Sequence, residues 1–181
     1  MALWTELYDT FYPAGTRARA ILEQHSRSVA DLALDINARR ALGLDPEQVE
    51  AAAMLHDIGI FLTDAPSIDC HGCRPYLLHG VLGADLLRRH GLPEWAARVS
   101  ERHTGTGIAL DEVASVGLPD DGRIYMPQSE LERLVCYADK FYSKSRDMSR
   151  KSLDRVRRSL ARFGDASLAR FEALHAAFGI E

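Results

Sequence analysis

The stretch Met-Leu-His-Asp-Ile-Gly, residues 54–59, places a histidine and an aspartate side by side at the end of an apolar segment. That segment, residues 49–55, predicts a buried helix whose last turn carries His56 and Asp57 into the interior. Burial of an imidazole and a carboxylate costs on the order of several kcal/mol unless a partner compensates. A bound metal ion is one such partner, and a hydrogen-bonded core histidine is the more common explanation for a single pair of this kind.

Most of the remaining chain shows apolar residues three or four positions apart, the spacing of amphipathic helices. Helix starts are marked by Asp45-Pro46 and by a capping box at Ser129 and Glu132. Residues 60–74 and 117–128 have the composition of loops. We therefore predict an all-α, single-domain helical bundle, with helices at 3–12, 16–41, 45–58, 75–90, 92–103, 110–116 and 129–142 and two more that carry Leu153 to Phe163 and Leu168 to Phe178.

Length and composition restrict the class of protein. A chain of 181 residues suffices for one domain with a sizeable core. A net charge of -4 argues against a general nucleic-acid binder, which needs a basic surface to neutralise phosphates. No apolar run approaches the roughly 18 residues of a membrane span, and the N-terminus lacks the pattern of a signal peptide. Three cysteines are too few for a disulfide framework, so we expect a cytoplasmic protein that does not associate with membranes.

Several ionisable residues occupy the inward faces or the ends of the predicted helices. Side chains placed in this way on different helices converge in the middle of a bundle. So many buried ionisable groups would be hard to sustain without a cation, which favours the metal interpretation over the core-histidine one. The residues are His25, His56, His79, His103 and Asp139.

In these residues the chain resembles the HD-domain superfamily, named for its His…His-Asp…Asp metal motif. His25 matches the first histidine, the His56-Asp57 pair followed by Ile-Gly matches the doublet in the form called HDIG, and Asp139 before a lysine matches the closing aspartate. The resemblance implies a helical bundle with a central metal site.

The resemblance also implies how the chain is organised. Residues 16–146 correspond to the HD domain itself. We expect residues 1–15 to form an N-terminal helix that packs on this core, and residues 147–181 to form C-terminal helices that complete the same domain.

Two further histidines, His79 and His103, match the middle positions of a six-ligand subset of the superfamily, which implies two metal ions. Asp57 would then bridge both ions, with His25, His56 and Asp139 on one and the two middle histidines on the other. Imidazole and carboxylate donors suit transition metals, so we expect iron first, then manganese, zinc or nickel, with magnesium as a further alternative. No Gly-Tyr-Pro sequence follows His103, which separates the chain from the cyclic-dinucleotide phosphodiesterase branch.

The activity implied by this resemblance is that of a metal-dependent phosphohydrolase acting on a phosphoester or phosphoanhydride of a nucleotide or another small phosphorylated metabolite. A hydroxide between two metals about 3.5–4 Å apart is a strong nucleophile at neutral pH. Asp57, His79 and His103 would be the catalytic residues. Two alternatives stay open, a di-iron oxygenase with the same ligand set and a non-catalytic nucleotide-binding module. A homo-oligomer is also compatible with the sequence.

Five polar residues beside the expected ligands are predicted to contact the substrate. Lysine and arginine can receive phosphate oxygens, although each alone is equally consistent with a surface ion pair. Lys140, which follows Asp139 directly, is our first choice. The five residues are Arg74, Arg102, Thr104, Lys140 and Lys144.

Two other features have no assigned role. The pair Cys70 and Cys73 is half of a zinc site, and the sequence offers no second pair, so we expect a loop with two free thiols. A lid over the substrate is a candidate role for this loop. The arginine-rich residues 150–162 are expected to form a solvated face or a phosphate or partner contact.

Overall fold

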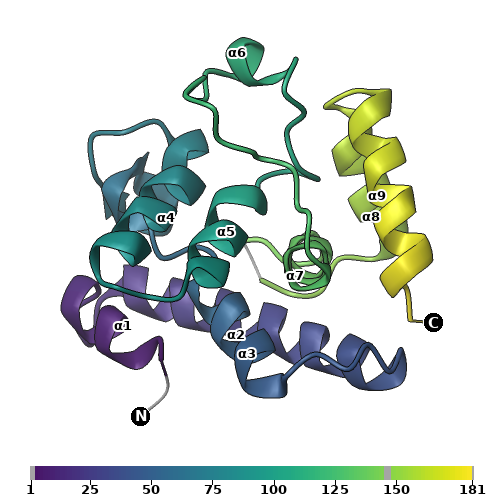
Figure 1. Ribbon diagram of the computed structural model, residues 1–181. Helices are drawn as coiled ribbons and strands as arrows, with labels where there is room; N and C mark the ends of the chain where they lie inside the picture. The colour runs from purple at the N-terminus through teal and green to yellow at the C-terminus, as the bar shows by residue number, and fades with distance from the viewer. Residues whose placement is uncertain (1–2, 145–147, 181) are drawn as a thin grey trace.

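Helices form nearly all the regular structure of the computed structural model, which describes residues 3–144 and 148–180 (Figure 1). The predicted all-α fold class is therefore confirmed. The α-helices are α1 (Thr5–Phe11), α2 (Arg17–Arg39), α3 (Pro46–Leu55), α4 (His79–Arg89), α5 (Glu94–Arg102), α6 (Val113–Val116), α7 (Glu130–Asp139), α8 (Leu153–Ala161) and α9 (Asp165–Phe178). Short 3-10 helices lie at η1 (Ile60–Leu62), η2 (Pro66–Ile68) and η3 (Tyr76–Leu78).

The predicted start signals lie where the helices begin. The Asp45 side chain accepts a hydrogen bond from the backbone N–H of Glu47, and Pro46 occupies the first helical position. Ser129 and Glu132 form the reciprocal bonds of a capping box at the start of α7. These contacts satisfy N–H groups that have no partner inside the helix, which explains why the helices start at these residues.

One helix ends earlier than the sequence indicates. We expected the helix before the His-Asp pair to run to residue 58, but α3 ends at Leu55 with His56 as its C-cap. The chain then turns tightly, and a Cβ atom at Gly59 would lie 2.3 Å from the carbonyl oxygen of His79. Because α4 passes this close, only a glycine fits at residue 59.

Residues 60–74 are not the simple loop that their composition predicts. Strands β1 (Asp64–Ala65) and β2 (Cys70–His71) form a small antiparallel sheet, flanked by η1 and η2, in which Ala65 pairs with Cys70. The backbone N–H of Gly72 also donates to the carbonyl of Thr63 at 2.9 Å. Only a residue without a side chain allows this approach, since a Cβ atom at Gly72 would lie 2.1 Å from the backbone of Leu62.

Two other local expectations are wrong. The predicted helix at 110–116 shrinks to α6, because residues 109–112 form a turn instead. Phe163 was expected on the apolar face of its helix, but α8 ends at Ala161 and the Phe163 side chain is 74% exposed in the turn that follows.

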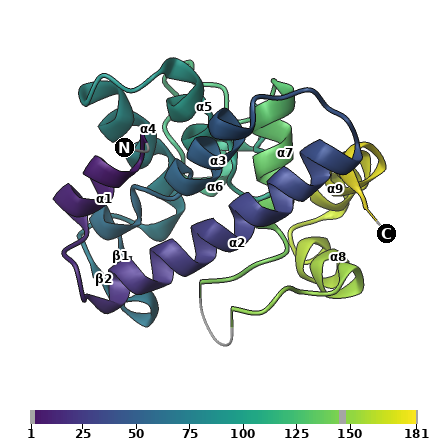
Figure 2. The same cartoon turned by 90° about the horizontal axis from the view of Figure 1, so that it is seen from below.

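The helices pack around α7, which Figure 1 shows nearly end-on in the middle of the molecule. Helix α7 contacts α2, α3, α5 and α9, while α2 crosses the whole molecule (Figure 2). Helix α1 packs on this core through Tyr8, whose hydroxyl donates to the carbonyl of Met54 at 2.5 Å. Within the described part of the chain, no helix combines the length and the apolar character needed to cross a membrane.

Helices α4 and α5 approach each other closely through small residues. A Cβ atom at Gly83 would lie 2.5 Å from Oγ of Ser100, and one at Gly80 would lie 2.5 Å from the Ser100 carbonyl oxygen. Glycine at both positions therefore permits near contact of the two backbones. This contact brings His79, at the start of α4, next to His103, at the end of α5.

Candidate metal centre

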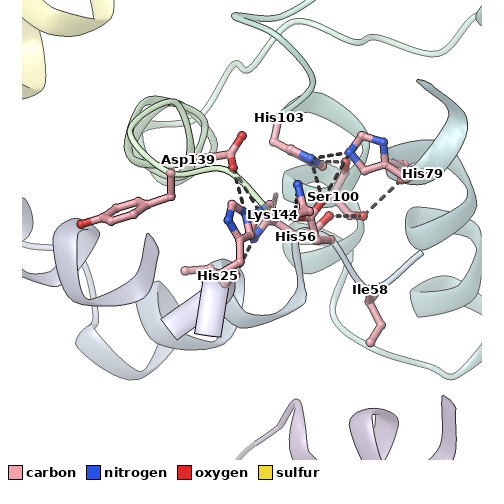
Figure 3. Close-up of polar contacts among 12 residues, drawn as sticks. His25, His56, Ile58, His79, Ser100, His103, Asp139 and Lys144 are labelled. Carbon is pink, nitrogen blue, oxygen red and sulfur yellow. Dashed lines mark hydrogen bonds and ion pairs between the residues drawn. The ribbon is translucent and has the colours of Figure 1, made fainter. Parts of the chain in front are cut away.

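The six predicted ligands converge in one buried cluster, and Figure 3 labels all of them except Asp57. His25 comes from the middle of α2, while the other five residues lie at or next to helix ends. All six have buried side chains, although their sequence positions extend from 25 to 139. The other five are His56 at the C-cap of α3, Asp57 directly after it, His79 at the start of α4, His103 at the C-cap of α5 and Asp139 at the end of α7.

The cluster divides into two groups that share Asp57. In the first group, Nε2 of His25 lies 3.1 Å from Oδ2 of Asp57 and 3.1 Å from Oδ1 of Asp139. Nε2 of His56 lies 3.0 Å from the same Asp57 oxygen. In the second group, Oδ1 of Asp57 lies 3.3 Å from Nε2 of His79 and 3.4 Å from Nε2 of His103. Each carboxylate oxygen of Asp57 thus faces a different group.

These separations equal the distances between neighbouring ligand atoms around one metal ion. With metal–ligand bonds of about 2.1 Å, adjacent ligand atoms lie about 3.0 Å apart in an octahedron and about 3.4 Å apart in a tetrahedron. The distances from Asp57 to its four histidine neighbours match this range. The geometry of the donor atoms therefore fits divalent metal binding.

The orientation of the imidazole rings supports the same conclusion. Nδ1 of His56, His79 and His103 lies 2.6–2.7 Å from the backbone carbonyl three residues earlier. A carbonyl can only accept, so in the neutral ring the proton is on Nδ1 and the Nε2 lone pair points into the cluster. The Nε2 atoms of His79 and His103 lie only 2.9 Å apart, and two lone pairs this close repel each other unless a cation lies between them.

The carboxylate of Asp57 lacks ordinary hydrogen bonds although it is fully buried. Neither oxygen accepts a bond of good geometry from the described residues. Burial alone would raise the pKa of this carboxyl, but the charges of His56 and Lys144 outweigh burial and hold the pKa well below its usual range. Asp57 is thus an ionised, buried carboxylate with the Lys144 ammonium at one oxygen and histidine nitrogens around both, an arrangement that a metal ion would also fit.

The histidines differ in the charge that they can carry. Burial lowers the pKa of His79 to about 3, so its ring is neutral and available as a ligand. Burial also acts to lower the pKa of His56, but the carboxylates of Asp57 and Asp139 together outweigh burial and raise the pKa to about 9. The two carboxylates therefore favour a positive charge in the first group. A bound cation would supply such a charge.

Two of the predicted substrate-binding residues reach the cluster. Nζ of Lys144 lies 2.6 Å from Oδ2 of Asp57, and Nζ of Lys140 lies 2.8 Å from Oδ2 of Asp139. Lys140 also donates to the backbone carbonyl of His103 at 3.1 Å. Both ammonium groups are held at the edge of the proposed metal site.

The other three predicted substrate contacts lie differently. Thr104 follows His103 and is partly buried, and the Arg74 side chain is exposed. Arg102 does not join the cluster, because its guanidinium lies 3.0 Å from the buried carboxylate of Glu132 and donates to the carbonyl of Ile124. Its contacts are those of a structural ion pair.

Two residues that sequence reasoning missed also belong to this site. The hydroxyl of Ser100 donates to the carbonyl of His56, and its own carbonyl accepts from the His103 ring. The Tyr76 ring stacks on the His79 ring, with centroids 4.6 Å apart. Ser100 lies three residues before His103 and Tyr76 lies three before His79, so this spacing is the signal that would have found them.

Comparison with protein families gives the assignment that this geometry suggests. The HD domain family matches residues 22–143, a range that includes all six clustered residues. The chain belongs to the HD domain family. The resemblance seen in the sequence is therefore confirmed, and with it a helical HD domain whose buried histidines and aspartates fit a metal site.

Curated relatives of this HD domain carry other names. A tRNA (cytidine(56)-2'-O)-methyltransferase of Thermoplasma volcanium is 35% identical over 135 residues, which is 75% of this chain and 35% of the relative. The corresponding protein of Picrophilus torridus is 35% identical over 109 residues, or 60% of this chain and 28% of the relative. An uncharacterized protein of Methanocaldococcus jannaschii is 38% identical over 109 residues, which is 60% of this chain and 56% of that protein. The chain thus spans about a third of the length of the two methyltransferases.

Solved structures show the same fold at lower identity. The HD domain of the L. monocytogenes phosphodiesterase PgpH has a TM-score of 0.59 and 16% identity, and the match covers 96% of this chain and 93% of that one. The same domain in complex with cyclic-di-AMP has a TM-score of 0.57, with 96% and 92% covered. At 16% identity this likeness concerns the fold alone.

Proposed function

We propose that this HD domain is a metal-dependent phosphohydrolase that holds two divalent transition-metal ions and cleaves a phosphoester or phosphoanhydride of a nucleotide or small phosphorylated metabolite. The observation that carries the proposal is the pair of ligand groups that share Asp57. A carboxylate with one oxygen toward each group is suited to bridge two ions. The mixed nitrogen and oxygen donors favour iron, manganese, zinc or nickel over magnesium.

The charge of the site supports an anionic substrate. The carboxylates of Asp57 and Asp139 are already balanced by the ammonium groups of Lys144 and Lys140. Each divalent ion would therefore leave two positive charges unbalanced in a buried site. Phosphate groups would neutralise this excess, whereas a neutral substrate would not.

The chemistry assigned to the chain is mainly binding and orientation. Two bound metal ions would lower the pKa of a water molecule and neutralise charge on a phosphoryl oxygen. His79 and His103, with Nδ1 fixed by backbone carbonyls, keep their Nε2 atoms directed at Asp57. Lys144 and Lys140 would receive phosphate oxygens as the substrate displaces them from the carboxylates, with Thr104, beside His103, as a further donor.

The names of the similar proteins bear on the substrate without deciding it. The PgpH HD domain has been solved with cyclic-di-AMP, which is consistent with a nucleotide substrate here. The methyltransferase name belongs to proteins of which this chain spans only about a third, so methyl transfer to RNA is a competing outcome of the test. The cytoplasmic location inferred from the cysteines stays a prediction.

Metal analysis combined with a substrate screen tests the proposal. We expect two metal ions per chain after anaerobic purification and phosphate release from at least one nucleotide, dinucleoside polyphosphate or sugar phosphate. Asp57→Ala should remove most of the metal and lower turnover at least about 100-fold, with the helical circular dichroism signal retained. Asp64→Ala, which removes an exposed carboxylate in β1, is the control and should retain both metal and turnover.

Three results would refute the proposal. Wild-type turnover by Asp57→Ala would show that the cluster is not the catalytic centre. Oxygen uptake without phosphate release would identify an oxygenase instead. Methyl transfer to RNA without phosphate release would identify the activity named for the archaeal relatives.

A further inference from the structure

Helices α8 and α9 lie on the side of α7 away from α5 (Figure 1). A cavity outside the metal cluster is lined there by residues of α7, of the segment 150–153 and of the end of α9. Its volume is about 420 Å³, within the range of small-molecule sites. The polar part of its lining includes Arg150, Lys151 and Ser152, and the apolar part includes Phe141, Leu153 and Ile180. None of these residues belongs to the metal cluster.

The cations of this cavity have no carboxylate partner among the residues that the structure describes. The guanidinium of Arg150 lies over the Phe141 ring, 5.3 Å from its centroid, and forms no ion pair there. Nζ of Lys151 donates to the backbone carbonyls of Lys140 at 3.2 Å and Tyr142 at 3.0 Å. The described lining contains no aspartate or glutamate.

The carboxylates near this cavity interact with other residues. Glu172 on α9 forms a two-bonded ion pair with Arg157, with both contacts at 2.8 Å. Asp154, in the first turn of α8, is exposed and also acts on Arg157, and Asp139 at the end of α7 acts on Lys151. In the part of the chain that the structure describes, neither carboxylate forms an ion pair with Arg150 or Lys151.

Two further features of the cavity favour an anion. Ser152 is the N-cap of α8, and the first N–H groups of a helix have no intrahelical partner and carry a partial positive charge. Burial lowers the pKa of the Lys151 ammonium, and the nearby charges of Lys140 and Lys144 act in the same direction while Asp139 opposes them. An anion beside Lys151 would relieve this repulsion.

We propose that this cavity is a binding site for a small organic phosphate, separate from the metal centre. The phosphate group would lie against Arg150, Lys151 and the first turn of α8, because two cations and a helix N-terminus suit a dianion. The organic part would contact Leu153 and Ile180. A neighbouring cavity of about 510 Å³ shares Ile180 and His175 with the first, and its arginines are already engaged, since Arg39 pairs with Asp35 and Arg40 donates to the carbonyl of Gly179.

Binding must be distinguished from occupation of the metal centre, because Lys151 contacts the backbone of Lys140, next to Asp139. We would titrate adenosine monophosphate and inorganic phosphate calorimetrically into the full chain after chelation of metals, and into Asp57→Ala. We expect both probes to bind in both backgrounds, with the nucleotide tighter. Because Asp57→Ala removes the proposed metal centre, this result stands even if the proposed phosphohydrolase activity is wrong.

Two arginine variants of equal charge change then locate the site. Arg150→Gln should weaken both probes about 10-fold, the effect of losing one charge-assisted hydrogen bond. Arg158→Gln removes an exposed arginine of α8 that is outside the cavity lining and should change affinity less than about 2-fold. Lys151→Gln, checked for folding by circular dichroism, should behave like Arg150→Gln.

Three outcomes would overturn the proposal. They are no binding of either probe, equal weakening by the Arg150 and Arg158 variants, and loss of binding in Asp57→Ala. Equal weakening would mean a diffuse attraction to the basic helix, and loss in Asp57→Ala would mean binding at the metal centre.

Discussion

At the scale of single residues, three histidines of the candidate metal centre share one hydrogen-bond arrangement. Each lies at a helix end and has Nδ1 next to the carbonyl three residues earlier, at Ala53, Tyr76 and Ser100 respectively. The contact selects the tautomer and fixes the ring plane before any metal arrives. His25 differs, because its Nδ1 lacks a hydrogen-bond partner among the described residues.

Single histidine replacements should separate the two ligand groups. His79→Ala removes a donor of the second group only, so we expect the loss of about one metal equivalent and retention of the other. Asp57→Ala, which touches both groups, should lose both equivalents. Elemental analysis measures the difference, with the exposed His71→Ala as control. If His79→Ala lost both ions, the two groups would not be separate sites.

The two predicted substrate-binding arginines should respond differently to replacement. Arg102→Met leaves the buried carboxylate of Glu132 without its partner, and breaking such a pair typically costs about 3–5 kcal/mol. Arg74→Met removes an exposed side chain and should change stability by less than about 0.5 kcal/mol. Urea unfolding measures both. Equal stability of the two variants would contradict the structural role given to Arg102.

At the scale of elements, the contact of α4 with α5 sets the distance between the two histidines of the second ligand group. His79 begins one helix and His103 caps the other, and Gly80, Gly83 and Ser100 form the contact between them. A larger residue in this contact would separate the helices. The Nε2–Nε2 distance of 2.9 Å would increase with it.

Gly83→Ala tests this control directly. Its Cβ atom would lie 2.5 Å from Oγ of Ser100, so we expect a destabilisation of about 1–3 kcal/mol and weaker binding of the second metal ion. The control is Gly91→Ala, just beyond the same helix, whose Cβ atom would meet no atom within 4 Å. Because Gly91 has a positive φ, we expect this variant to lose about 1 kcal/mol of stability. Metal titration should distinguish the two, and unchanged affinity in Gly83→Ala would disprove the spacing role.

At the scale of the whole molecule, the ligands connect helices that are distant in sequence. A metal ion in the first group would join α2, the end of α3 and α7, and one in the second would join α4 and α5 to the same aspartate. These helices already share one hydrophobic core. Bound metal would therefore act as a cross-link within a single cooperative unit.

Chelation should lower the thermal stability of the whole domain. Free metal at 100 times its dissociation constant stabilises the folded state by about 2.7 kcal/mol. For a chain of this size, chelation should then lower Tm by roughly 5–10 °C. Differential scanning calorimetry with and without a chelator measures the shift. Asp64→Ala should show the same shift and Asp57→Ala none, whereas an equal shift in both would point to metal bound elsewhere.

Much of the fold was predictable because its causes are local. The capping box at Ser129 and the Asp45-Pro46 start act within one turn of helix, so they can be recognised from neighbouring residues alone. The early end of α3 and the small sheet at 64–71 were missed, because both depend on close contact with segments that composition does not reveal.

By itself, the sequence determined the helical class and the inward faces of the helices, since periodicity and helix ends are encoded in short segments. Its resemblance to the HD-domain superfamily then identified the six residues that converge. Tertiary structure alone decided that Arg102 is paired with Glu132 rather than placed at the site, and that Ser100 and Tyr76 support the histidines. It also placed one oxygen of Asp57 toward each group, the arrangement that the resemblance implied. The physical reason is that such distances depend on how the helices pack together. Close packing is set by the shapes of residues far apart in the chain.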